Sequence, residues 1–257
     1  MKLRIEFFYA ILFAFLLVIP LAEARWSWPR YLKRLAANEP GARLRHFRSL
    51  LVWEWGLTLA FLGVWALAGQ PWNSLLLHQA APIQSYLFLL FSVLMIVVFL
   101  RQRRAILARP ATVERLRKRL EFARPLMPHT PAERRMFWAV SATAGICEET
   151  LYRGFLPWYL AGFIVPRTGA LTGIWIAITL SSLIFGLGHI YLGVNQVPRT
   201  ALVGLFLAVL TYFSGSLWPS MVLHAAIDWN SGELGYAMLN LPRSVSSGAD
   251  DPLISPP

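Results

Sequence analysis

Long apolar stretches are the feature that most restricts what this chain can fold into. Segments 5–22, 50–69 and 82–100 carry very few charged residues, and a membrane-spanning α-helix needs about 20 such residues to cross a bilayer. Backbone polar groups inside a bilayer must bond to one another, so spanning segments form helices or closed barrels. The apolar runs are continuous and do not alternate with polar residues, which disfavours a β-barrel. The sequence therefore predicts a helical membrane protein.

Composition and charge support this class. Of the 257 residues, 56% are hydrophobic and 14% are charged, whereas soluble chains average about 25% charged residues. The formal net charge is +11, and 18 of the 24 Lys and Arg residues lie in segments 25–48 and 101–135, beside apolar runs. Such clusters are typical of cytoplasmic loops near anionic lipid. We therefore expect a lipid bilayer around the protein and no nucleic-acid partner.

The first apolar run has two interpretations. Ala22-Glu23-Ala24 has the small-x-small form of a signal-peptidase site, so the run could be a cleaved signal peptide. Cleavage there would send the basic segment 25–48 to the outside, which the charge rule disfavours. We favour a retained helix with its N-terminus outside, and the cleaved signal peptide stays the alternative.

The remaining runs complete the predicted topology. Segment 70–81 has no Lys or Arg and is expected on the outer side, and further runs follow at 136–160, 169–190, 200–214 and 217–229. We predict an all-α fold, a polytopic transmembrane helix bundle of about seven membrane helices with the C-terminus inside. A weak run at 234–241 could re-enter as an eighth. The basic segment 101–135 is expected to be a solvated linker, with a short amphipathic surface helix as the alternative.

Ionisable side chains inside these runs are expected to mark a functional site. Each costs roughly 2.5 to 3.5 kcal/mol at the centre of a span on insertion scales. Glu149 and Arg153 are four residues apart, so they share a helix face and can pair. Glu148 lies about 100° round the helix from Glu149 and is expected to face a cavity.

Two histidines add imidazole groups to this set. His189 follows Gly186 and Gly188, which let another backbone or a substrate come close. His224 and Asp228 are four residues apart, so Asp228 is expected to accept a hydrogen bond from one ring nitrogen and fix the tautomer. A carboxylate with two imidazoles and an orienting acid is suited to activating water.

These residues form three motifs. Glu148-Glu149-Thr150-Leu151-Tyr152-Arg153 fits E-E-x-x-x-R, Phe185 to His189 fits F-x-x-x-H, and His224 to Asp228 fits H-x-x-x-N/D. In this order, on predicted membrane helices, they resemble the CPBP family of intramembrane glutamic endopeptidases. This is the CAAX protease and bacteriocin-processing (ABI) family, which includes Rce1-like enzymes. The resemblance covers roughly residues 136–230.

The resemblance implies a role for each residue. Glu148 would be the general base that activates water for attack on a peptide carbonyl, with His189 assisting. Glu149 and Arg153 would be structural or substrate-orienting, and His224 would stabilise the oxyanion. The family often has Asn where this chain has Asp228, and an ionised Asp cannot donate a hydrogen bond. Asp228 is therefore either protonated or limited to orienting His224. The implied mechanism needs no cofactor and no metal.

The predicted function is an intramembrane endopeptidase that hydrolyses a peptide bond of a membrane-associated protein or peptide. We divide the chain into N-terminal membrane helices with basic cytoplasmic loops (1–135), a catalytic membrane core (136–242) and a disordered tail (243–257). The compact size and Arg-rich loops favour a multi-pass protein of a bacterial inner membrane. The sequence leaves open the substrate, its prenylation and the oligomeric state.

Alternative functions use the same residues. A zinc-dependent membrane protease could use two His and one carboxylate as ligands, although no H-E-x-x-H motif is present. A non-catalytic scaffold or immunity protein could bind a hydrophobic peptide, and a proton-coupled transporter could use buried Glu and His. Cys147 is expected to be a small buried hydrophobe and not a nucleophile. Glu6 and Glu54, near span ends, are expected to be solvated or interfacial.

Overall fold

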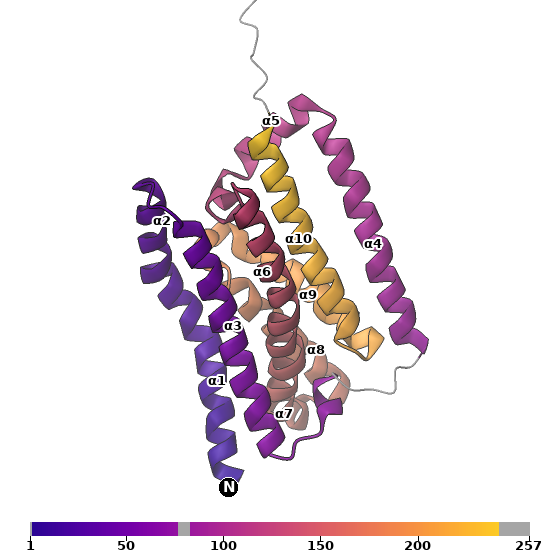
Figure 1. Cartoon of the computed structure of the whole chain (residues 1–257). Helices are drawn as coiled ribbons and strands as arrows, with labels where there is room; N and C mark the ends of the chain where they lie inside the picture. Colours follow the sequence, from indigo (N-terminus) through magenta and orange to yellow (C-terminus); the bar gives the residue numbers. More distant parts are fainter. Residues whose placement is uncertain (1, 77–82, 242–257) are drawn as a thin grey trace, which may run out of the picture.

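The computed structural model describes residues 2–76 and 83–241, and this part of the chain is helical with no β-strand (Figure 1). Five helices are long and apolar enough to cross a membrane: Ile5–Ala36, Ala42–Leu67, Ile83–Leu107, Ala170–Leu187 and Val194–Ser214. The predicted all-α polytopic bundle is confirmed. The predicted disordered tail at 243–257 lies outside the described residues.

The elements follow one another with short connections. In chain order they are α1 (Lys2–Ala22), η1 (Glu23–Ser27), α2 (Trp28–Ala36), α3 (Ala42–Leu67), η2 (Trp72–Leu75), α4 (Ile83–Leu107), α5 (Pro110–Arg119), η3 (Glu121–Leu126), α6 (Pro131–Glu149), η4 (Thr150–Phe155), α7 (Leu156–Thr168), α8 (Ala170–Leu187), η5 (Ile190–Leu192), η6 (Val194–Gln196), α9 (Val197–Ser214) and α10 (Trp218–Asn240). Elements η1 and η4 are π-helical turns, and the other η elements are 3₁₀ turns.

The basic segments lie at one end of the bundle. In Figure 1 the N-terminus lies at the opposite end from α2, α5 and the last turn of α10. Segments 25–48 and 101–135 contain α2 and α5 and therefore share that end. This arrangement agrees with the alternation of basic and neutral connections in the sequence.

The first predicted span coincides with α1, and the helix continues beyond it. Helix α1 does not end in a loop at residue 22, because η1 carries it directly into α2, and the continuous helix extends to Ala36. Much of the segment 25–48 is therefore helical. A π turn accommodates one extra residue without breaking the helix, which hydropathy alone does not reveal.

The weak run at 234–241 is not a separate re-entrant segment. It forms the second half of α10, continuous with the run at 217–229. Glu233 interrupts the hydropathy there, but Arg134 on α6 neutralises it through Nε–Oε1 and Nη2–Oε2 contacts of 2.6 and 2.7 Å. Because α6 satisfies this carboxylate, the helix passes through the polar interruption intact.

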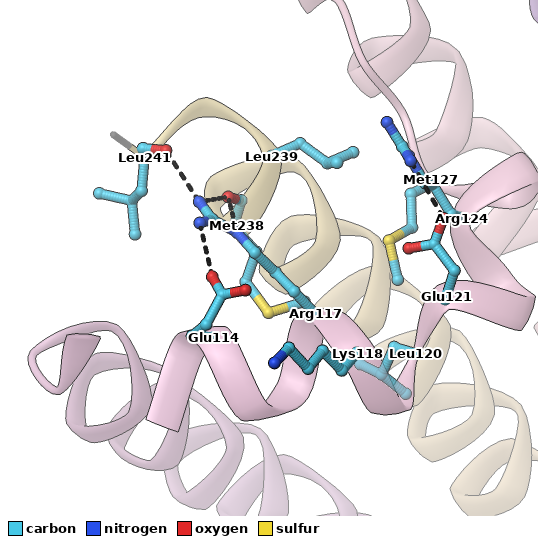
Figure 2. Close-up of a pocket in the computed structure, with 10 residues that line it drawn as sticks. All are labelled: Glu114, Arg117, Lys118, Leu120, Glu121, Arg124, Met127, Met238, Leu239 and Leu241. Carbon is cyan, nitrogen blue, oxygen red and sulfur yellow. Dashed lines mark hydrogen bonds and ion pairs between the residues drawn. The ribbon is translucent and has the colours of Figure 1, made fainter. Parts of the chain in front are cut away.

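The basic segment contains the short helix α5, which agrees with the helical alternative of the sequence analysis. Arg117 on α5 donates from Nε to the Met238 carbonyl (3.0 Å) and from Nη2 to the Leu241 carbonyl (2.8 Å), as Figure 2 shows. These carbonyls end α10 and have no partner within the helix. Arg117 thus fixes the end of α10 at the edge of a pocket of about 550 Å³ that α5, η3 and α10 line.

The N-terminal helices pack directly on the helix that carries the first motif. Tyr9 of α1 and Phe61 of α3 contact Phe155 of η4 at ring-centroid distances of 5.8 and 5.0 Å. Trp65 and Phe155 are fully buried in the same cluster. Aromatic burial of this kind is among the largest contributions to packing, so α1 and α3 hold η4 in place.

Helices α6 and α10 approach closely at Gly145. A Cβ atom on Gly145 would lie 2.8 Å from the Ala225 Cβ, the Ala225 nitrogen and the Met221 carbonyl oxygen. Two of these three atoms are backbone and cannot rotate away. The absent side chain therefore sets the distance between the two helices that carry the first and third motifs.

We predict that Gly145→Ala destabilises the protein. Overpacking a close contact costs about 1–3 kcal/mol, so the Tm in detergent should fall by about 2 °C or more. The matched control is Gly63→Ala on α3, where the added Cβ has no neighbour within 4 Å. The change at residue 63 should leave Tm equal or higher, because Ala favours a helix over Gly. Equal shifts for both variants would contradict this account of the α6–α10 contact.

Candidate active site

Helix α6 carries the first motif and begins at a well-formed cap. The Thr130 hydroxyl accepts a hydrogen bond from the Glu133 backbone N–H (3.2 Å), and the Glu133 carboxylate accepts one from the Thr130 N–H (3.1 Å). Pro131 occupies the first helical position, where its lack of an N–H has no cost. The start of the helix is therefore fixed, and the motif lies at its other end.

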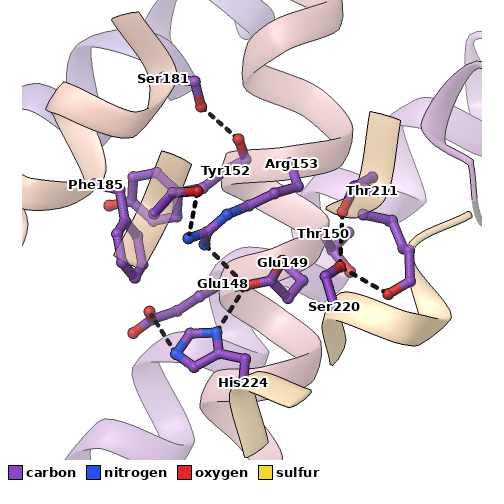
Figure 3. A network of polar contacts seen from close by, with 12 residues as sticks. Glu148, Glu149, Thr150, Tyr152, Arg153, Ser181, Phe185, Thr211, Ser220 and His224 are labelled. Atoms are coloured by element: carbon purple, nitrogen blue, oxygen red, sulfur yellow. Dashed lines mark hydrogen bonds and ion pairs between the residues drawn. The ribbon is translucent and has the colours of Figure 1, made fainter. Parts of the chain in front are cut away.

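The motif continues into the π turn η4, which contains Arg153. Ser181 of α8 donates a hydrogen bond to the Tyr152 carbonyl inside this turn (Figure 3). Such turns are frequent at functional sites because they redirect side chains and leave backbone groups free to bond elsewhere. Here the bond joins η4 to α8, the helix that leads to the second motif.

Glu149 is the central side chain of the site (Figure 3). It is fully buried, and its Oε1 atom lies 2.9 Å from Arg153 Nη1 and 2.7 Å from His224 Nδ1. The predicted pairing of Glu149 with Arg153 is confirmed. A buried carboxylate needs compensating partners, and here a single oxygen contacts both a guanidinium and an imidazole.

Arg153 links this carboxylate to two further helices. Its Nη2 lies 3.5 Å from the Gly204 carbonyl oxygen on α9, and its Cζ lies 3.9 Å from the ring centroid of Phe185 on α8. Gly204 has room for no side chain, since a Cβ there would lie 2.9 Å from the Phe185 ring. The flat guanidinium thus fits between a carboxylate, a carbonyl and an aromatic face.

Glu148 has a different environment from Glu149. Its side chain is 21% exposed, it does not pair with Arg153, and its Oε2 atom has no hydrogen-bond partner among the described residues. The same atom lies 3.9 Å from His224 Nε2. Glu148 is therefore the carboxylate of the motif that remains free to interact with water or a substrate.

The partner that orients His224 is Glu149 and not Asp228, which corrects the sequence expectation. A carboxylate only accepts hydrogen bonds, so His224 Nδ1 carries the proton and donates it to Glu149. Asp228 Oδ2 lies 3.7 Å from Nε2, which is beyond hydrogen-bond range. The i,i+4 spacing placed Asp228 on the correct face, but Glu149 from another helix makes the shorter contact.

His189 lies at the end of α8, and the ring of Phe185 joins it to the rest of the site. Its Nδ1 is 3.0 Å from the Phe185 carbonyl oxygen, which can only accept, so Nδ1 donates. The Phe185 ring lies 4.9 Å from the ring of His189 and 5.8 Å from that of His224. When the ring of His189 is neutral, its Nε2 atom is therefore the nitrogen that can accept a hydrogen bond.

Glu54 was expected to be solvated or interfacial, and the structure shows that one of its carboxylate oxygens is buried. Its Oε2 atom is buried without a hydrogen-bond partner among the described residues, and its charge interacts with those of Glu148, Asp228 and Glu23. No motif includes Glu23 or Glu54, which lie far from the three motifs in sequence. The only sign in the sequence that Glu54 could belong to the site was its position as a single Glu in an otherwise apolar run.

Two further expectations from the sequence concern Cys147 and a bound metal ion. Cys147 is fully buried, as expected of a small hydrophobe. Within residues 2–76 and 83–241, no group of three or more His, Cys, Asp or Glu side chains is arranged to hold a metal ion.

We predict that Arg153→Lys lowers stability as well as activity. Lysine keeps the charge but cannot reach the carboxylate, the carbonyl and the Phe185 face together. Weakening a buried pair in this way should lower the Tm in detergent by about 4 °C or more. Arg167→Lys, at an exposed position on α7, is the control. An unchanged Tm for the residue 153 variant would show that the planar guanidinium is not required.

Comparison with known proteins agrees with the motifs. Residues 131–230 match the family model described as type II CAAX prenyl endopeptidase Rce1-like. No curated protein matches the chain, and no solved structure does. The matched segment starts at the first residue of α6 and contains all three motifs, and the family is a family of membrane proteases. The segment 131–230 of this chain is therefore similar to the Rce1-like CAAX proteases.

Proposed function

We propose that this multi-pass membrane protein hydrolyses a peptide bond of a membrane-associated protein or peptide, with Glu148 as the base that activates water. The observation that carries the proposal is the contrast between two adjacent carboxylates. Glu149 is fully buried, and one of its oxygens contacts both Arg153 and His224, whereas Glu148 is partly exposed and has no contact shorter than 3.9 Å to His224. Of the two, Glu148 is the one that water can reach and that Arg153 does not hold.

The reaction divides between the groups that face the substrate. Glu148 accepts a proton from water as the oxygen–carbon bond forms, and returns it to the leaving nitrogen as the carbon–nitrogen bond breaks. His224 Nε2, when protonated, donates to the oxyanion, since Nδ1 is already bonded to Glu149. His189 Nε2 accepts a hydrogen bond from the attacking water and helps to orient it.

The other motif residues act through these groups. Glu149 fixes the ring of His224, and Arg153 balances the charge of Glu149. Asp228 lies 3.7 Å from His224 Nε2, so we assign it an electrostatic influence on that nitrogen and no proton transfer. For the location, we propose a bacterial inner membrane, because the chain is compact and its basic segments gather at one end of the bundle.

Glu148→Gln is the first test of this mechanism. The amide keeps the size of the side chain but removes the base, so cleavage should fall at least about a hundredfold, while Tm and membrane insertion persist. The measurement compares the termini of membrane proteins in cells that express either form at equal levels. Glu6→Gln, at an exposed position on α1, is the control. Identical termini in all three strains would contradict the proposal and favour a binding scaffold.

The roles of His224 and Asp228 should separate kinetically. His224→Ala removes an oxyanion donor, for which about a 10²- to 10³-fold loss in kcat is typical, whereas Asp228→Asn should lose less than about tenfold. The measurement is kcat/KM on a substrate identified from the cleaved termini, with Tm recorded for both variants. Equal losses at both positions would show that Asp228 takes part directly in the reaction.

A further inference from the structure

Two carboxyl groups from outside the matched segment lie near the candidate active site. Glu23 lies in the π turn η1 and Glu54 lies in α3, and the charges of both interact with that of Glu148. Neither has a Lys or Arg partner among the described residues, where the ion pairs of the site involve Glu148, Glu149 and Asp228 alone. The proposed mechanism gives neither residue a task.

Local contacts hold both residues beside the site. Trp55, next to Glu54, donates from Nε1 to the Thr143 hydroxyl of α6 at 2.9 Å, slightly more than one turn before Glu148. Element η1 packs on η5, and the ring of Trp28, directly after η1, lies 4.9 Å from that of Tyr191. Tyr191 in turn stacks with His189. The N-terminal helices therefore form one wall of the site.

Carboxyl groups outnumber basic groups in the site. Five carboxyl groups lie there, Glu23, Glu54, Glu148, Glu149 and Asp228, against one guanidinium, Arg153, and the imidazoles of His189 and His224. A buried polar atom without a hydrogen-bond partner is costly, and the buried Oε2 atom of Glu54 has no such partner in this part of the chain. A cationic donor would satisfy this oxygen.

We propose that Glu23 and Glu54 form an acidic subsite that binds a Lys or Arg side chain of the substrate near the bond that is cleaved. This inference rests on the proposed function, because it places the peptide next to Glu148. A peptide ammonium or guanidinium donates a hydrogen bond to the free oxygen of Glu54. A metal ion fits less well, since the described residues hold no metal-binding group of three His, Cys, Asp or Glu side chains.

The test measures binding and cleavage with one set of probes. A neutral, lipid-anchored, fluorescent peptide carries a single Lys or Gln that is moved through successive positions, and the protein is held in nanodiscs of neutral phosphatidylcholine. At one or two positions the wild type should bind the Lys peptide about tenfold more tightly than the Gln peptide. In Glu54→Gln and Glu23→Gln this ratio should fall to about threefold or less.

Two controls separate specificity from folding. Glu54→Asp keeps a carboxylate and should retain most of the Lys preference, and Glu6→Gln, remote from the site, should retain all of it. The Lys-to-Gln ratio does not depend on the fraction of folded protein, so a purely structural effect would leave it unchanged. Equal binding of both peptides by the wild type, or a Lys preference that persists in both Gln variants, would overturn the subsite. A Lys preference without any cleavage would instead contradict the proposed function and leave the subsite standing.

Discussion

The buried carboxylate of Glu149 is the interaction on which the rest of the site depends. One of its oxygens contacts Arg153 on its own helix and His224 on α10. Arg153 then reaches Phe185 and Gly204, so four helical segments meet around this charge. Removing one member of such a buried pair commonly costs about 3–5 kcal/mol, because the other charge stays behind without a partner. The same contacts that stabilise the bundle therefore also fix the imidazole ring.

Much of the fold and of the motif pairing could be predicted because those properties are local. Apolar runs specify spanning helices, and the i,i+4 spacing of Glu149 and Arg153 specifies their contact. The π turn η1, which joins α1 to α2, has no comparable sequence signal. Continuity of α10 through Glu233 depends on Arg134 from α6, a tertiary contact between residues 99 positions apart.

The errors at the site share the same physical cause. Asp228 has the correct spacing to His224, yet Glu149 bonds the ring because the packing of α6 on α10 brings it closer. Glu54 reaches the site only because α3 packs against α6. Periodicity along one helix identifies the face of a residue, whereas the neighbouring helix decides which partner that face meets.

The position of α10 in the chain has a consequence for biogenesis. His224 is 75 residues from Glu149, and its helix is the last element that the structure describes. Membrane helices enter the bilayer in the order of synthesis, and chains fold from the N-terminal end as they emerge. The carboxylates of α6 are thus in the membrane before the imidazole that completes the set. On the proposed mechanism the nascent protein stays inactive until α10 is inserted, which protects the chain and its neighbours at the translocon.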